Sequence, residues 1–145
     1  MDLKEFKSLI DLFFYQAGKQ NPQSVFLESL NPRNKKKFTW GETSSNIYKL
    51  AKTLRANITD GDRCLLVSEN RPEWLISDIA IMLANGITVP AYTTYTEKDY
   101  KYLIEDCQPS VIIVSNNEMH DKLKNIIDET SFIKKIITFE KVQNV

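Results

Sequence analysis

Apolar residues along this 145-residue chain follow two alternating patterns: short apolar runs, and longer stretches with apolar residues three or four positions apart. The short runs are typical of strands buried on both faces, and the longer stretches are typical of amphipathic helices. Strands that alternate with helices of about 10–15 residues imply a parallel sheet with helices on both faces. The predicted fold class is therefore α/β. The four predicted strands span residues 63–68, 87–92, 110–115 and 134–139.

The N-terminal part departs from this alternation. Apolar side chains recur at helical spacing before Gly18, which is predicted to end an N-terminal helix. Two short apolar segments, 25–27 and 37–38, flank the basic run NPRNKKK, which predicts a short antiparallel hairpin with a solvated loop. Phosphate contact by the basic run is the alternative. We therefore expect a helix and hairpin over residues 1–40 and an alternating helix–strand lobe over residues 41–140.

Polar residues and proline mark where the predicted helices begin. Thr39 and Glu42 have the spacing of a capping box, in which each side chain satisfies a backbone N–H of the other residue. Pro72 suits a first helical position, where a missing N–H costs nothing. Thr96 is expected to cap the helix that follows the second strand of the lobe. Gly61 follows an aspartate and predicts a turn, because glycine tolerates positive φ.

Composition and charge exclude some partners and locations. Nineteen basic and nineteen acidic residues give a formal net charge of zero, so no nucleic-acid partner is expected. Charges interrupt the apolar N-terminal segment, which argues against a secretory signal, and no run approaches the ~20 apolar residues of a membrane span. Cys64 and Cys107 fall within a predicted strand and a predicted helix. They are expected to be reduced thiols, which fits a cytoplasmic protein.

Several common types of site lack their residues. The four glycines stand alone at turns, so neither glycine-rich phosphate-binding motif is present. His120 is the only histidine and has no partner at metal-ligand spacing, so it is expected to face solvent. A phosphoacceptor receiver domain would need an aspartate where this chain has Ser115. By themselves, the residues of this sequence match none of these common types of site.

Three segments occur in a fixed order with natural spacing: FTWGETSSNIYKLAKTL, DGDRCLLVSENRPEWLISDIAIMLANGITVPAYTT and DCQPSVIIVSN. Together they resemble the N-terminal part of the AMP-forming acyl-CoA synthetases, and within that family the long-chain fatty acid branch. The resemblance spans roughly residues 5–140, and its most specific part is NRPEW…GITVPAYTT. It implies that residues 1–145 are a partial N-terminal, AMP-binding domain and form its first lobe.

The resemblance implies a fatty acid–CoA ligase. In that family the carboxylate is first joined to the α-phosphate of ATP with release of pyrophosphate, and the CoA thiol then displaces AMP. ATP, Mg²⁺ and CoA serve the full-length enzyme. The phosphate-binding loop of the family ends in Pro-Lys and lies C-terminal to every segment matched here. This chain alone is therefore expected to be inactive and to hold none of these groups.

The resemblance also suggests a substrate-binding loop. In related synthetases the loop after the matching strand lies along the channel for the pantetheine arm of CoA. Here that loop is Tyr92, Thr93 and Thr94, and hydroxyls or exposed backbone there suit hydrogen bonds to amides. Thr93 stands where many relatives have proline, which leaves the local backbone open. The alternative is that Thr93 and Thr94 only lead into the helix capped by Thr96.

Asn70, Arg71 and Trp74 form a second candidate cluster. Arg71 carries a charge that suits phosphate, but it precedes Pro72, which favours an extended conformation at a helix entrance. Asn70 is expected to satisfy N–H groups at that helix start, and Trp74 to fill the core or an interdomain surface. We interpret this cluster as structural.

Two other classes stay open beside the ligase. A non-catalytic α/β binding or assembly module would be favoured by a stop codon after Val145. A flavodoxin-like cofactor binder would be excluded by a featureless visible spectrum. The chain finishes a strand and stops, which we interpret as truncation, and an uncovered strand edge predicts a homo-oligomer. Fatty acid, ATP and CoA are the expected partners through the full-length enzyme, with peripheral membrane contact as a further expectation.

Overall fold

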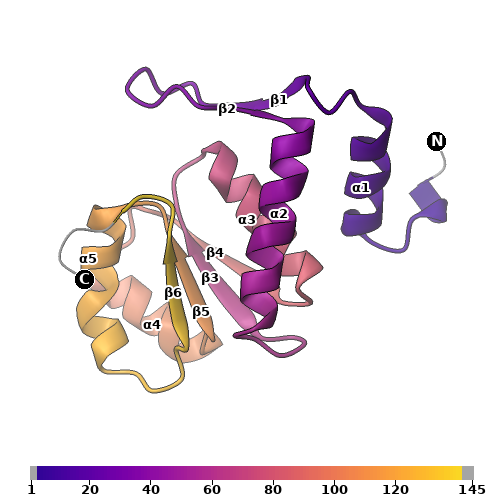
Figure 1. Cartoon of the computed structure of the whole chain (residues 1–145). Coiled ribbons are helices and arrows are strands. Elements are labelled where there is room, and N and C mark those ends of the chain that lie inside the picture. Colours follow the sequence, from indigo (N-terminus) through magenta and orange to yellow (C-terminus); the bar gives the residue numbers. More distant parts are fainter. Residues whose placement is uncertain (1–2, 142–145) are drawn as a thin grey trace.

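The computed structural model describes residues 3–141 and contains the predicted parallel sheet (Figure 1). Its strands are β3 (Arg63–Val67), β4 (Ile87–Ala91), β5 (Val111–Val114) and β6 (Lys135–Thr138). Their order across the sheet is β4-β3-β5-β6, and all neighbours are parallel. Leu66 of β3 pairs with Pro90 of β4 on one side and Ile113 of β5 on the other. The predicted α/β fold is confirmed.

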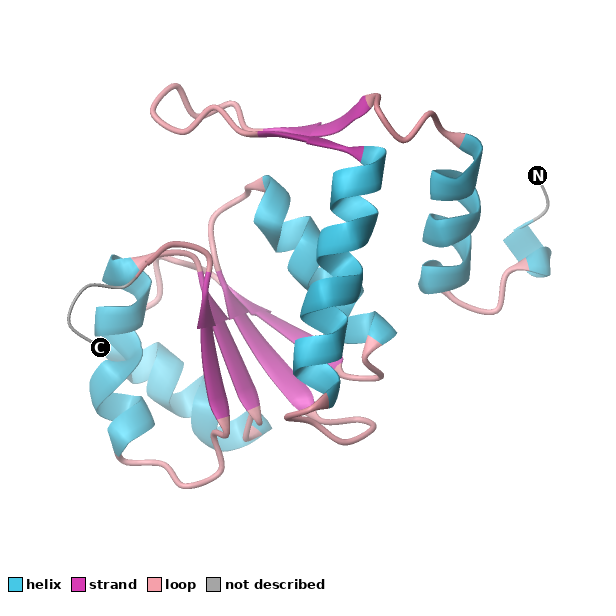
Figure 2. Cartoon of the chain, viewed as in Figure 1, coloured by secondary structure: helices cyan, strands magenta, loops and turns pink. Residues whose placement is uncertain are grey.

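Helices cover both faces of this sheet (Figure 2). The helices are α2 (Trp40–Arg55), α3 (Pro72–Leu83), α4 (Glu97–Cys107) and α5 (Asn117–Asp128). Successive side chains of a strand point to opposite faces, so Leu66 packs with α2 and α3 while Leu65 packs with α4 and α5. Both leucines are fully buried, which stabilises the fold by about 1.5–3 kcal/mol each. This double burial explains why β3 is apolar throughout.

The N-terminal helix and the hairpin are also present. They comprise a short 3₁₀ turn, η1 (Leu3–Glu5), then α1 (Leu9–Lys19), β1 (Val25–Glu28) and β2 (Lys37–Thr39). The strands β1 and β2 are antiparallel, as expected, and their loop projects from the body (Figure 1). The predicted stop at Gly18 is wrong, because Gly18 lies inside α1 with no positive φ and the helix ends one residue later.

Most of the predicted helix boundaries are confirmed. Pro72 occupies the first turn of α3, and Thr96 caps α4 in a reciprocal arrangement with Asp99. Gly61 has a φ of 83° in the turn before β3, where a side chain would be strained. Asn85 has a φ of 61° just beyond α3 and helps to end that helix. These residues fix where the helices begin and end, and so where the loops lie at both ends of the strands.

Three single residues test the sequence interpretation. Cys64 and Cys107 are free thiols, as expected, and burial raises the pKa of Cys64 to about 11, so its thiol stays protonated at neutral pH. The prediction that His120 faces solvent is wrong, because its side chain is only 13% exposed. His120 follows the buried Met119 and lies only about 100° round the helix from it, at the border of the buried stripe.

No helix among residues 3–141 combines the length and the apolar character needed to cross a membrane.

Candidate functional site

The carboxyl ends of the four strands meet at one edge of the sheet, and their loops form the candidate site. The chain leaves β3 through α3 toward β4, and it leaves β5 through α5 toward β6, in the opposite direction. The edge between β3 and β5 is therefore a topological switch point, where open α/β sheets bind their ligands. Ser68 begins the loop after β3, and Ser115 begins the loop after β5.

A cavity of about 480 Å³ opens at this edge, over the ends of β3 and β4. Tyr92 and Thr93 line it, together with Trp74, whereas Thr94 is exposed and lies outside the lining. The structure thus brings two of the three loop residues proposed from the sequence to a cavity. The complete lining consists of Ser68, Glu69, Asn70, Trp74, Pro90, Ala91, Tyr92 and Thr93.

The loop after β4 is held by hydrogen bonds to its backbone carbonyls. The carbonyl oxygen of Tyr92 accepts from the hydroxyl of Tyr100 at 2.6 Å and from the N–H of Tyr95 at 3.3 Å. The carbonyl oxygen of Thr93 accepts from Nζ of Lys122 at 3.1 Å. Sequence reasoning missed both side-chain contacts, because Tyr100 and Lys122 lie on helices 8 and 29 residues from their partners along the chain.

Arg71 lies beside this cavity with a side chain that is only 7% exposed. Its guanidinium donates two hydrogen bonds to the carboxylate of Glu73, at 3.0 and 3.1 Å. It also donates to Glu69 at 3.2 Å and to Glu140 at 2.8 Å. Burial lowers the pKa of Arg71, but these carboxylates outweigh burial and raise it above the ordinary range. Arg71 is therefore a fixed cation whose donors are committed to protein carboxylates.

A second cavity of about 580 Å³ separates the hairpin loop from the same edge of the sheet. Glu69, Glu140 and Glu28 line it along with Arg71. These carboxylates outnumber the cations and disfavour a phosphate ligand. The structural interpretation of Arg71 agrees with this arrangement.

The structure tests the predictions made for Arg71 and for its neighbours Asn70 and Trp74. Arg71 is extended, with φ −154° and ψ 161°, as expected of a residue before proline. Trp74 is partly buried against the core formed with α2, α3 and β3, which fits a packing role. The prediction that Asn70 caps α3 is wrong, because Arg71 is the N-cap residue and, among the described residues, α3 has no side-chain capping hydrogen bond. Asn70 instead lines both cavities.

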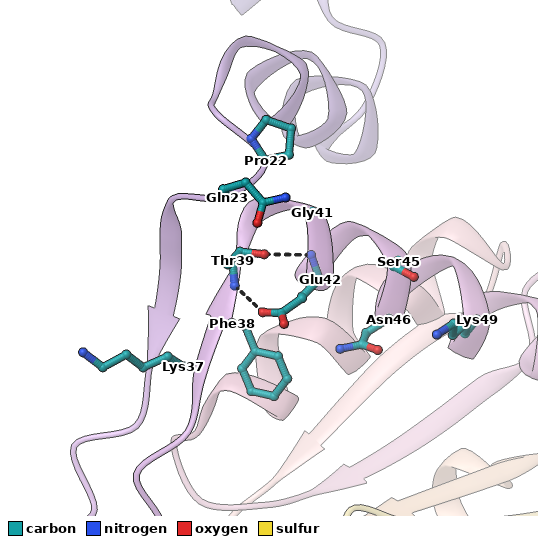
Figure 3. Close-up of a pocket in the computed structure, with 10 residues that line it drawn as sticks. All are labelled: Pro22, Gln23, Lys37, Phe38, Thr39, Gly41, Glu42, Ser45, Asn46 and Lys49. Carbon is teal, nitrogen blue, oxygen red and sulfur yellow. Dashed lines mark hydrogen bonds between the residues drawn. The ribbon is translucent and has the colours of Figure 1, made fainter.

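A third cavity, of about 600 Å³, lies at the N-terminus of α2 (Figure 3). There the N–H of Thr39 donates to Glu42 at 2.8 Å, and the N–H of Glu42 donates to Thr39 at 3.1 Å, which confirms the predicted capping box. The helix start is thus occupied by the protein itself. None of the lining residues follows a strand of the parallel sheet, so we assign this cavity no role in the candidate site.

The residues present do not fit a triphosphate with its metal ion. Within residues 3–141, no group of three or more His, Cys, Asp or Glu side chains could hold a metal ion. The chain has four glycines, and none stands in a cluster that would let backbone N–H groups approach a phosphate. The described residues at the sheet edge therefore lack both kinds of group that usually bind a polyphosphate and its metal ion.

Comparison with known proteins gives a family match over most of the chain. A family model described as AMP-binding enzyme matches residues 13–144. Long chain acyl-CoA synthetase 3 of Arabidopsis thaliana is 28% identical over 107 residues, which cover 73% of this chain and 16% of that protein. A long-chain-fatty-acid–CoA ligase of Bacillus subtilis is 37% identical over 79 residues, covering 54% and 14%. The chain thus spans only a small part of these relatives.

Solved structures share the fold. The anthranilate CoA ligase AuaEII, in complex with anthranoyl-AMP, superposes with a TM-score of 0.83 at 18% identity, over 96% of this chain and 27% of that one. A mutant form of coronafacic acid ligase from Pectobacterium brasiliense superposes with a TM-score of 0.80 at 20% identity, over 90% and 25%. The arrangement of helices and strands described above is therefore one that these ligases also have.

Proposed function

Because this chain belongs to the family of AMP-binding enzymes, we propose that it is the N-terminal part of an ATP-dependent, AMP-forming fatty acid–CoA ligase. The observation that carries this proposal is the family match over residues 13–144, together with the activity named for its relatives. A carboxylate is a poor electrophile, since attack on it would have to expel an oxide. Joining it to AMP supplies a leaving group, which the thiol of CoA then displaces to form the thioester.

Within that enzyme, this chain supplies one wall of the site and not the phosphate-binding machinery. The isolated glycines and the absence of a metal-binding group in residues 3–141 support this division. We place the loop that holds the triphosphate, with its Mg²⁺, in polypeptide C-terminal to residue 145. The coding sequence beyond Val145 is expected to continue into a Ser/Thr/Gly-rich segment that ends in Pro-Lys. A stop codon there would favour a non-catalytic assembly module instead.

We assign Tyr92, Thr93 and Thr94 to the channel for the pantetheine arm of CoA. Two features support the assignment: the cavity of about 480 Å³ that Tyr92 and Thr93 line, and the position of that cavity at the carboxyl edge of the sheet. The arm carries two amides, which the hydroxyls and the backbone of this loop can bind. Replacing Thr93 with valine keeps the volume and removes the hydroxyl, and it is expected to weaken CoA binding a few-fold.

A long-chain fatty acid is the proposed acid substrate. The names of the Arabidopsis thaliana and Bacillus subtilis relatives support it, whereas anthranilate, named for one of the structural neighbours, is the competing choice. The complete protein, incubated with ATP, Mg²⁺, CoA and a C16 acid, is expected to release AMP and pyrophosphate and to form the thioester. Formation of ADP, or faster turnover of anthranilate than of the C16 acid, would contradict the proposal.

We also propose a cytoplasmic location. The free thiols of Cys64 and Cys107 support it, since exported proteins tend to pair their cysteines. Cell fractionation that recovers the protein outside the cytoplasm would contradict this assignment.

A further inference from the structure

Two side chains from different helices hold two consecutive carbonyl groups of the loop after β4. Tyr100, from α4, donates its hydroxyl to the carbonyl oxygen of Tyr92 at 2.6 Å. Lys122, from α5, donates Nζ to the carbonyl oxygen of Thr93 at 3.1 Å. The two contacts come from positions 8 and 29 residues away along the chain. The loop is therefore held by side chains of two helices, in addition to its own turn, in which the N–H of Tyr95 donates to the carbonyl oxygen of Tyr92 at 3.3 Å.

The contact from Tyr100 is suited to hold a backbone in one conformation. Its ring is fully buried in the core between the sheet and α4, so the hydroxyl has little freedom to move. Burial raises the pKa of Tyr100, with smaller contributions from nearby Tyr95 and acidic groups. The hydroxyl therefore remains protonated, and available as a donor, throughout the neutral range. Tyr95 packs edge-on against the same ring, at 5.7 Å between ring centroids.

The contact from Lys122 adds a charged donor to the next peptide group. Its ammonium lies 3.5 Å from the carboxylate of Glu118, one turn earlier on α5, and this pair holds the amine near the loop. A hydrogen bond from a charged donor is stronger than one between neutral groups. Lys122 therefore restrains the peptide group that joins Thr93 to Thr94.

Fixing these carbonyls also aims the neighbouring N–H groups. All peptide bonds in the described residues are trans, so each N–H points opposite to the carbonyl of its own peptide group. The N–H groups of Thr93 and Thr94 consequently point away from Tyr100 and Lys122. Within residues 3–141, neither of these two N–H groups has a hydrogen-bond partner in the protein. The loop thus has two successive unpaired N–H groups, each in a peptide group whose carbonyl is held by a helix side chain.

We propose that Tyr100 and Lys122 are positioning residues for the CoA step, which hold the Tyr92–Thr94 loop so that its free N–H groups meet an amide carbonyl of the pantetheine arm. This inference rests on the proposed function, because it needs CoA as the thiol substrate. Neither residue contacts the reacting atoms. Both act through the loop, so their loss affects capture of the thiol and leaves formation of the acyl-adenylate intact.

The test uses the complete enzyme and separates its two half-reactions. Tyr100→Phe removes only the hydroxyl, and Lys122→Met removes only the charged donor. Each is expected to raise KM for CoA about tenfold, the effect of losing one well-placed hydrogen bond, while single-turnover pyrophosphate release without CoA stays within about twofold of wild type. Tyr102→Phe and Lys124→Met are matched controls on the same helices, since both side chains are exposed and make no hydrogen bond in the described residues.

The outcomes separate the inference from the proposed function. A wild-type enzyme that forms no adenylate overturns the proposed function and this inference with it. An active wild type with an unchanged KM for CoA in both variants overturns the inference alone. Equal losses in both half-reactions point to a general structural role and also overturn it. If Tyr100→Phe fails to fold, Lys122→Met decides the matter, because Lys122 lies at the surface of α5 and its loss leaves the core intact.

Discussion

The guanidinium of Arg71 donates a 2.8 Å hydrogen bond to Glu140, which lies 69 positions later in the chain. Arg71 stands at the start of α3 and Glu140 follows β6, so this contact joins the loops of two strands that are not neighbours in the sheet. The same guanidinium binds Glu73, to which Lys36 of the hairpin loop also donates at 3.0 Å. One buried cation therefore ties the hairpin, α3 and the carboxyl edge of the sheet together.

Replacing Arg71 with methionine is expected to destabilise the fold by about 3 kcal/mol, because it leaves the carboxylate of Glu73 largely buried without its main partner. Urea denaturation measures the change in the free energy of unfolding. Arg33→Met is the matched control, since Arg33 is exposed in the hairpin loop and its side chain has no hydrogen-bond or ion-pair partner among the described residues. Equal stability of the two variants would show that the Arg71 cluster does not hold the edge together.

The same cluster makes the stability of the fold depend on pH. Burial raises the pKa of Glu73, but hydrogen bonds from Arg71 and Lys36 outweigh burial and hold it at about 2, below the ordinary 4.5. A depressed carboxyl pKa contributes stability that is complete above pH 4.5 and is lost as the pH falls toward 2. The stability lost in Glu73→Gln is expected to shrink from about 3 kcal/mol at pH 7 to almost nothing at pH 2. If the free energies of unfolding of the wild type and Glu73→Gln differed by the same amount at every pH, this prediction would be refuted.

Two glycine substitutions are expected to have opposite signs. A Cβ at Gly86 would lie 3.0 Å from Cδ1 of Ile58 and 3.1 Å from Cγ2 of Ile81, in the core beside β4. Gly86→Ala should therefore cost about 1–2 kcal/mol through overpacking. Gly18 has open space around it inside α1, so Gly18→Ala should stabilise by roughly 0.5 kcal/mol. Thermal unfolding measures both; a stabilised Gly86→Ala would show that the site has room to relax.

The outermost strand of the sheet, β6, provides a further test. In the described residues β6 pairs only with β5, so its outer backbone groups have no strand partner. Exposed edges of this kind can pair with a second copy of the chain. We expect light scattering on the isolated chain to give a mass that rises with concentration. A constant monomer mass across the concentration range would contradict the expected homo-oligomer.

Patterns that act over a few residues predicted most of the fold. The apolar run from Cys64 to Val67 predicted a strand buried on both faces, because both faces of the sheet demand apolar side chains. The Thr39–Glu42 capping box was predicted from a spacing of three residues, and the structure contains it. Gly18 was predicted to end the helix, but α1 includes it and ends at Lys19, since helix propensity is a weak effect and one glycine can lie within a helix.

Contacts between residues far apart in the chain could not be predicted from the sequence. Glu140 binds Arg71 and Lys36 binds Glu73, and both approach this pair only after β6 and the hairpin have docked. Tyr100 is fully buried, and the partner of its hydroxyl depends on the path of the loop after β4. Residues 92–94 could be named by resemblance alone, and the donors that hold them became visible only in three dimensions.

We infer that this chain forms a wall of the site and leaves the handling of triphosphate to other polypeptide. Incubating the isolated chain of residues 1–145 with ATP, Mg²⁺ and a C16 fatty acid tests it most directly, with released pyrophosphate as the readout. We expect no pyrophosphate above the level of a protein-free control, and we expect the complete protein to release it under the same conditions. Steady release of pyrophosphate by the isolated chain would contradict the claim.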